Sequence, residues 1–270
     1  MNERVRKLRE TIGPGEYYIC TEKCRLITES FKKTERQPEI LRNAAAFAHV
    51  LDNINIFIGD DELIVGNVAS KPRGIEFGNL FGVWSDPEID GLKEDEGFVI
   101  SAADEEELRK LQAYWTGKTF ASRMARIFDD ERLWPYVTLG VTLPPAPGSE
   151  EAFEKGSAIA GNGMAVCPEH GAILYGPDYR KVLYGGLKSI IEEAETEFRN
   201  TRFRHENDFE KADFLRAAIT ANKAIIRFAH RFADLASDLA AKEKDAGRKM
   251  ELKKIADTCR RVPEHPARSF

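Results

Sequence analysis

The feature that most constrains the fold is the stretch between Phe209 and Ala246, which contains neither glycine nor proline. Its apolar residues recur at helical spacing and form a stripe too broad for a helix with a single buried face. A continuous helix over residues 209–242 would be about 50 Å long. We therefore expect a long helix covered on two sides by other elements. The stripe consists of Phe214, Leu215, Ala218, Ile219, Ile225, Ile226, Ala229, Phe232, Leu235 and Leu239.

The composition is that of a globular chain. With 270 residues, of which 42% are hydrophobic, it can bury a sizeable core in one large domain or two small ones. A net charge of -5 argues against nucleic acid or an anionic membrane as a partner. The N-terminus MNERVRKLRE lacks the apolar core of a secretory signal, and no stretch approaches the roughly eighteen apolar residues of a membrane span. We expect a cytoplasmic protein with reduced thiols.

The first sixty residues predict three helices. A short one holds Val5 and Leu8 and ends at residues 13–15, GPG. A second runs within residues 18–35, and a third begins at Pro38, so that the two form an antiparallel pair. The apolar face of the second helix consists of Cys20, Cys24, Ile27 and Phe31, and that of the third of Leu41, Ala45, Ala48, Leu51 and Ile54.

Further along, the pattern changes repeatedly. Residues 62–67, ELIVGN, read as a short strand, and residues 71–99 as irregular backbone that wraps large apolar side chains onto a core. Ser101 followed by Asp104 resembles a capping box, which opens a helix containing Leu108, Leu111 and Trp115. Another helical piece is expected at 119–128, and within residues 134–148 a strand-like run that ends at Pro144 and Pro145.

A loop rich in glycine and proline, from Gly161 to Pro177, leads into a helix that extends to Arg199. Loops anchored by a rigid element commonly carry binding residues, and this one holds Met164, Cys167, His170 and Tyr175. After Gly247, which is expected to break the long helix, a last helix ends at Pro263. The buried face of the helix after the loop is predicted to be Leu183, Leu187, Ile190, Ile191, Ala194 and Phe198, and that of the last helix Leu252, Ile255, Cys259 and Val262.

No self-contained catalytic set or metal site stands out. Cys20 and Cys24 are interpreted as packing residues, because no second Cys/His pair lies nearby. Cys167 and His170 could be a thiolate and its base, although a cysteine in such a loop is more often inert. His49 and His230 are interpreted as packing histidines without a partner. The acidic runs at 104–107 and 192–195 are predicted to be solvated helix faces.

Several motifs resemble the N-terminal part of the glycyl radical enzymes of the pyruvate formate-lyase type. They occur in the family's order from Arg25 to the last residue. The resemblance implies a mainly α fold with few short strands, in which helices surround a ten-stranded barrel. Residues 1–270 would then be the N-terminal part of such a domain. Truncation at the C-terminus is expected because PEHPARSF resembles a family segment that normally continues into a helix. The motifs are RLITESFKKTE (25–35), ELIVGN (62–67) with KPRG (71–74), YWTGKT (114–119), PDYRKVLYGGLKSIIEE (177–193) and CRRVPEHPARSF (259–270).

The same resemblance implies what the chain lacks. Members store a radical on a glycine near the C-terminus and attack the substrate with a cysteine commonly followed by a glutamate. None of the four cysteines lies in such a motif, so no catalytic residue is assigned. The chain is expected to bind no cofactor itself. The parent enzyme would carry a glycyl radical installed by a radical S-adenosylmethionine activase.

By resemblance, the loop before Asp178 forms one wall of the substrate pocket. The candidate substrate-binding residues are Cys167, His170, Leu174 and Tyr175. Leu174 and Tyr175 make this wall apolar, which favours an arylacetate decarboxylase over a diol or hydroxyproline dehydratase, since a diol would call for hydrogen-bonding groups. The expected partners are a small-molecule substrate, the activase, the C-terminal remainder of the barrel and, for the full-length enzyme, a second copy. The alternative is a non-catalytic helical scaffold or a split-gene subunit.

Overall fold

The computed structural model describes residues 2–12, 16–67, 69–76, 89–90, 98–116, 118 and 178–269. The chain divides into two compact units. The first consists of Met1–Gly15, Arg25–Ile75 and Asp178–Phe270, and the second of Glu16–Cys24 and Glu76–Pro177. The described elements are mostly helices with a few short strands, as the sequence predicts.

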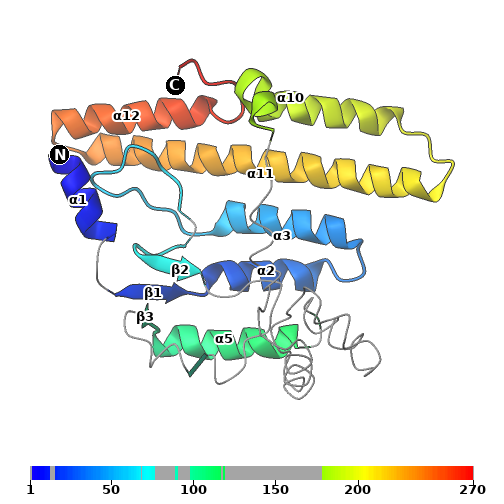
Figure 1. Cartoon of the computed structure of the whole chain (residues 1–270), viewed down its shortest axis with the longest axis horizontal. Coiled ribbons are helices and arrows are strands. Elements are labelled where there is room, and N and C mark those ends of the chain that lie inside the picture. Colours follow the sequence, from blue (N-terminus) through cyan, green and yellow to red (C-terminus); the bar gives the residue numbers. More distant parts are fainter. Residues whose placement is uncertain are drawn as a thin grey trace, which may run out of the picture. The chain divides into compact units, whose positions relative to one another are not determined.

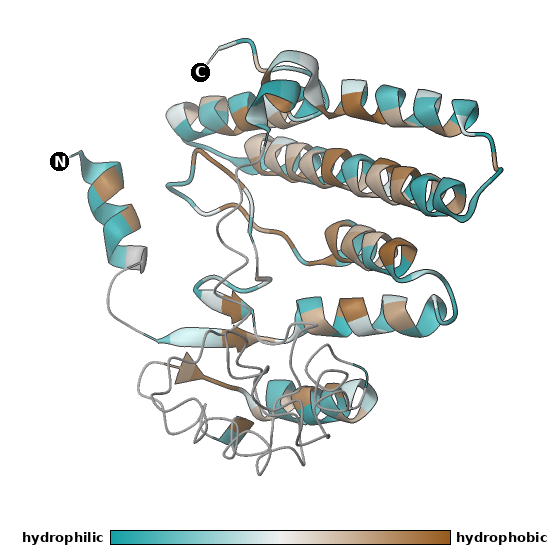
Figure 2. Ribbon diagram, turned by 45° about the vertical axis from the view of Figure 1, so that its right-hand side comes forward, coloured by the Kyte–Doolittle hydropathy of each residue, from teal (hydrophilic) through white to brown (hydrophobic). Residues whose placement is uncertain are grey.

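The first unit is organised around α11, Glu206–Lys242, a single helix of 37 residues. Helix α3, Glu39–Asn53, packs along one side of it. On the opposite side α12, Ala246–Arg261, and α10, Tyr179–Asn200, follow one another along its length (Figures 1 and 2). The short α1, Glu3–Ile12, also belongs to this unit. The prediction of a long helix covered on two sides is confirmed, but Phe214, which was placed in its apolar stripe, is 59% exposed.

Small side chains let the neighbours of α11 approach closely. Ala224, Ala233 and Ala236 are fully buried. Near the end of α11, Ala236 and Ala240 form a core cluster with Leu252, Ile255 and Ala256 of α12. Alanine has the highest helix propensity and almost no side-chain entropy to lose, so this packing is compatible with a straight, uninterrupted helix.

The turn between α11 and α12 lies slightly earlier than the sequence indicates. Gly247 was expected to break the long helix, but it is the second residue of α12. The break falls at Glu243–Asp245, where the Asp245 carboxylate accepts a hydrogen bond from the Arg248 N–H at 2.7 Å. An aspartate N-cap therefore starts α12.

Helices α2, Glu22–Lys33, and α3 form the predicted antiparallel pair. Leu26 of α2 packs with Val50 and Ile54 at the end of α3, whereas the start of α3 meets the end of α2. There the Arg42 guanidinium donates to the Phe31 carbonyl oxygen at 3.1 Å and lies over the Phe31 ring. Cation–π contact and hydrogen bond together fix this end of the pair.

The predicted strand at residues 62–67 is wrong. This segment is an irregular loop, and the side chain of Ile64 is 92% exposed. Arg248 of α12 donates to the carbonyl oxygens of Glu62 at 2.8 Å and Gly59 at 2.7 Å. In a strand, the Glu62 carbonyl group would pair with a neighbouring strand. Here the Arg248 guanidinium satisfies it together with the Gly59 carbonyl group, because its several N–H donors can reach two acceptors at once.

A small sheet has the strand order β2-β1-β3, in which β2 is Gly74–Glu76, and its strands β1 and β3 belong to the second unit. Strand β1, Tyr17–Cys20, runs parallel to β3, Phe98–Val99, with Tyr17 opposite Phe98. The sequence predicted a helix from residue 18. Instead the chain is extended as far as Cys20, because Ile19 is needed in a buried cluster with Ile89 and Leu108.

Helix α5, Ala102–Trp115, begins where the sequence predicts. The Ser101 hydroxyl oxygen accepts a hydrogen bond from the Asp104 N–H at 3.1 Å and donates to the Asp104 carboxylate at 2.5 Å. Leu108, Leu111 and Trp115 are buried, which confirms the predicted face. The predicted helical piece at 119–128 and the strand-like run at 134–148 lie outside the described residues.

Candidate functional site

The predicted pocket wall lies in a part of the chain that the structure does not describe. Cys167, His170, Leu174 and Tyr175 all fall within the range 119–177. Their roles therefore stay predictions. The described chain resumes at Asp178, directly after the predicted loop, and the local structure there defines how that loop would be anchored.

Asp178 begins α10 as its N-cap. Its carboxylate accepts a hydrogen bond from the Arg180 N–H at 3.1 Å, which satisfies one of the free donors at the start of the helix. The first turns of α10 are exposed: Tyr179 by 68%, Leu183 by 60% and Tyr184 by 81%. Leu183 was predicted to belong to the buried face. That prediction is wrong because Gly186, with φ 71° and ψ 172°, interrupts the helical path between Leu183 and Leu187.

The cysteines in the described part of the chain behave as packing residues. Cys20 and Cys24 are 1% and 4% exposed, in agreement with the sequence interpretation. Cys259 is half-buried on α12, and burial raises the pKa of its thiol. A raised pKa keeps the thiol protonated and makes it a poor nucleophile. Among the described residues no group of three His, Cys, Asp or Glu side chains is arranged to hold a metal ion.

The two helical histidines have acidic neighbours, so the interpretation that neither is paired was wrong. His49 Nε2 of α3 lies 3.0 Å from a carboxylate oxygen of Glu29 on α2. This hydrogen bond, together with Arg25 on the next turn, holds the pKa of the Glu29 carboxyl below its ordinary range. His230 Nε2 of α11 lies 3.4 Å from the Glu264 carboxylate. Both contacts join separate segments of the first unit, which is a structural role.

In the second unit, a buried hydroxyl meets two carboxylates. Thr21, 2% exposed, donates a short hydrogen bond to Glu107 and lies 3.3 Å from a carboxylate oxygen of Asp104. The sequence placed the acidic run 104–107 on a solvated face, which is wrong for Glu107. No local signal could have shown this, because the partner is far away in the chain. The contact fixes the segment after β1 against α5.

None of the helices formed by the described residues has both the length and the apolar character needed to cross a bilayer.

The comparison with protein families is unambiguous. The family model described as "Pyruvate formate lyase-like" matches residues 1–270. Isethionate sulfite-lyase of Oleidesulfovibrio alaskensis is 32% identical over 274 residues, which cover 100% of this chain and 31% of that protein. (2S)-3-sulfopropanediol dehydratase of Klebsiella oxytoca is 28% identical over 266 residues, covering 96% of this chain and 30% of that protein.

Solved structures show the same relationship. The glycerol-bound form of the B12-independent glycerol dehydratase from Clostridium butyricum superposes with a TM-score of 0.80 at 33% sequence identity. The match covers 100% of this chain and 32% of that one. The chain thus spans about a third of the length of the relatives it matches, and it corresponds to an N-terminal portion of them.

Proposed function

The chain belongs to the pyruvate formate lyase-like family of glycyl radical enzymes, and from this premise we propose that it supplies the N-terminal helical part of a glycyl radical lyase or dehydratase. The observation that supports the proposal most strongly is that one family match extends over residues 1–270, with a TM-score of 0.80 to a glycerol dehydratase over 100% of the chain. Fold alone would not carry a function, but sequence and fold here agree on the same family.

We propose that the reacting groups lie outside this chain. By resemblance, the chemistry of the family rests on a glycyl radical near the C-terminus and on a cysteine in a mid-chain motif, and none of the four cysteines of this chain lies in such a motif. Residues 1–270 alone would then be inert. A radical S-adenosylmethionine activase and a second copy of the full-length enzyme are the expected partners of the complete protein.

For the substrate we propose a small hydroxylated aliphatic compound. The sequence favoured an arylacetate from Leu174 and Tyr175, but the relatives named above give that preference no support. Their names refer to isethionate, sulfopropanediol and glycerol, all of which carry a hydroxyl group. Such substrates require hydrogen-bonding side chains in the pocket. Cys167 and His170 are the polar members of the proposed wall, and Leu174 and Tyr175 would provide its apolar part.

The test is turnover by the complete protein that contains this sequence, activated under anaerobic conditions. The panel consists of isethionate, glycerol, 1,2-propanediol and 4-hydroxyphenylacetate. We expect turnover of at least one of the three aliphatic compounds and none of the aryl compound. Conversion of the arylacetate alone would refute the proposed substrate class. Replacement of His170 by phenylalanine should raise the KM for the aliphatic substrate about tenfold or more, because a polar contact to the hydroxyl is lost.

A further inference from the structure

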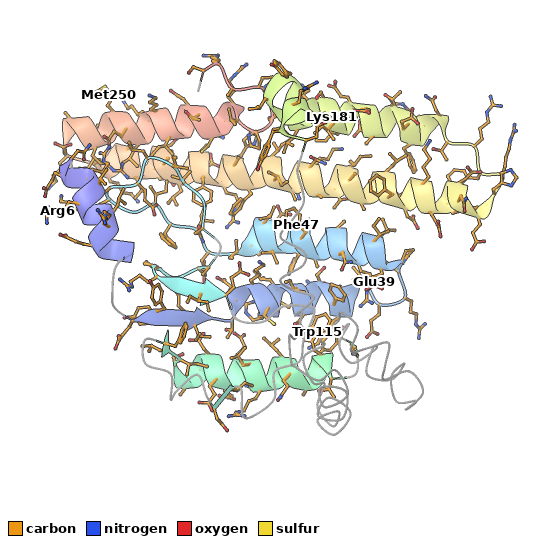
Figure 3. The ribbon with its side chains drawn as sticks, in the orientation of Figure 1. Arg6, Glu39, Phe47, Trp115, Lys181 and Met250 are labelled. Atoms are coloured by element: carbon orange, nitrogen blue, oxygen red, sulfur yellow. The ribbon has the colours of Figure 1, made fainter. Side chains whose placement is uncertain are left out.

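Helix α10 reverses its direction within its own length. Lys181 Nζ lies 3.0 and 3.2 Å from the two carboxylate oxygens of Glu193. In a continuous helix these residues would be about 18 Å apart along the axis, which their side chains could not span together. Residues 179–185, which carry Lys181 in Figure 3, therefore fold back on residues 187–200. We call residues 179–185 the arm.

The reversal occurs where another segment meets the backbone of α10. Gly186 adopts the left-handed φ of 71°, and the next two N–H groups turn away from the arm. The Leu187 N–H donates to the Pro263 carbonyl oxygen at 2.9 Å, and the Lys188 N–H to the Glu264 carbonyl oxygen at 3.1 Å. In a continuous helix both would bond to carbonyl groups of the arm, four residues earlier.

The segment that accepts these bonds, Val262–Pro266, is itself held in place by α12. We call it the latch. The Arg261 Nε donates to the Pro266 carbonyl oxygen at 2.9 Å, and the His265 N–H donates to the Arg261 carbonyl oxygen at 2.7 Å. The latch fits closely: a Cβ atom at Gly186 would lie 2.4 Å from the Glu264 carbonyl oxygen.

Apolar packing contributes little to the position of the arm. Its large side chains Tyr179, Leu183 and Tyr184 are between 60% and 81% exposed. The Lys181–Glu193 ion pair has side chains that are 55% and 62% exposed, so solvent screens it. The direction of the arm then depends mainly on the backbone conformation of Gly186 and on the two hydrogen bonds that hold the following Leu187 and Lys188 N–H groups to the latch.

We propose that the latch selects between two states of α10: the reversed state seen here and a continuous helix that forms when the latch is displaced. The continuous state would cost α10 no backbone hydrogen bond, because the Leu187 and Lys188 N–H groups would bond to the Leu183 and Tyr184 carbonyl oxygens instead. In the continuous state, the exposed aromatic side chains of Tyr179 and Tyr184 would take a different position relative to residues 187–200. The proposal does not depend on the proposed catalytic function.

Zero-length carbodiimide coupling followed by mass spectrometry tests the proposal on the protein without any label. An amide forms, with loss of water, only where a lysine amine touches a carboxylate. The reversed state joins Lys181 to Glu193. Two contacts between α10 and α11 serve as internal references, since they report that the helical body is folded: Lys223 with Glu195 at 2.8 Å, and Lys211 with Glu197 at 3.0 Å.

The deciding variant is Gly186→Ala, which adds the clashing Cβ and disfavours a positive φ. We expect the Lys181–Glu193 product to fall about fivefold or more relative to both references. The matched control is Gly66→Ala, because Gly66 also has a positive φ, of 139°, but nothing lies within 4 Å of an added Cβ. It should change the same ratio by less than about twofold.

Persistence of the Lys181–Glu193 product in Gly186→Ala with intact references would overturn the proposal, as would its absence from the unmodified protein. If the references also disappear in Gly186→Ala, Arg261→Ala decides instead, since it loosens the latch without adding a clash. A reduced Lys181–Glu193 product with intact references then supports the latch, and an unchanged product overturns it.

Discussion

Arg227 of α11 and Asp52 of α3 form a bidentate ion pair, in which both N–O distances are 2.8 Å. One turn further along α11, Arg231 donates to the carbonyl oxygens of Leu51 at 2.5 Å and Ile54 at 2.6 Å. Both arginines join the same two helices. They differ in what they satisfy: Arg227 reaches an exposed carboxylate, whereas Arg231 satisfies the free carbonyl groups at the end of a helix.

This difference predicts unequal costs for two equivalent substitutions. Arg231→Met should lower the free energy of unfolding by about 1–3 kcal/mol, because two partly buried acceptors lose their donor. Arg227→Met should cost only about 0–1 kcal/mol, as is usual for an exposed pair. Urea denaturation followed by circular dichroism measures both. Equal costs would show that the helix-end contact contributes no more than the surface pair.

Close packing between α11 and α12 leaves no room for larger side chains. Ala240 is 3% exposed and belongs to the cluster with Leu252 and Ile255. We expect Ala240→Leu to destabilise the chain by about 1–3 kcal/mol through overpacking. The matched control is the neighbouring exposed Ala241→Leu, which should stay within about 0.5 kcal/mol of the unmodified chain. Thermal unfolding of the two variants side by side gives the comparison, and a tolerated Ala240→Leu would contradict the described packing.

The contact between Glu29 and His49 predicts a dependence of stability on acid. The hydrogen bond from His49, with a smaller contribution from Arg25, lowers the pKa of Glu29 in the folded protein. A carboxylate with a lowered pKa contributes stability above its ordinary pKa of about 4.3, and this stability is lost as the pH falls through the lower folded value. Because the side chain of Glu29 is 39% exposed, solvent screening makes the effect modest.

Glu29→Gln should therefore flatten the loss of stability below about pH 4.3, while changing the shape of the curve above it little. Urea midpoints measured at intervals down to acid pH would show this. The exposed Glu192→Gln is the control and should follow the unmodified chain throughout. If Glu29→Gln and Glu192→Gln give parallel curves, Glu29 does not contribute in the way its contacts indicate.

The cap of α5 gives a prediction for the second unit. Ser101→Ala removes the acceptor of the Asp104 N–H and should cost about 0.5–2 kcal/mol, whereas Ser101→Asn, which keeps an acceptor, should recover most of the loss. Hydrogen exchange of residues 102–108 measures the change locally. Unchanged exchange in Ser101→Ala would mean that the hydroxyl group is not the stabilising group.

Helical periodicity in the sequence predicted the elements that the structure confirms. Its signals are local: the apolar stripe of α11, the Ser101 cap and the face Leu108, Leu111 and Trp115 needed no knowledge of a partner. The predictions are wrong where contacts with a distant segment of the chain determine the local secondary structure. Residues 18–20 were expected to be helical, but they belong to a strand in which Tyr17 pairs with Phe98 and Tyr18 with Val99. Residues 62–67 have strand-like composition, but they form an irregular loop in which Arg248 donates to the Glu62 carbonyl oxygen.

The loop that holds Cys167, His170 and Tyr175 could be singled out from its glycines and prolines, but its role as a wall of the substrate pocket, with Leu174, came only from resemblance. The spacing of these residues alone specifies no chemistry, and the role stays a prediction. Leu183 illustrates the limit of pattern reasoning near this loop. Its helical spacing to Leu187 is regular, but the intervening Gly186 takes a conformation that the latch segment imposes from the far end of the chain.

The most direct test of the proposed function is electron paramagnetic resonance of the complete protein containing residues 1–270, after anaerobic incubation with a radical S-adenosylmethionine activase. We predict the doublet of a glycine-centred radical in the complete protein and no such signal from residues 1–270 alone. A complete protein that folds, binds its activase and still shows no glycine-centred radical would contradict the proposed function.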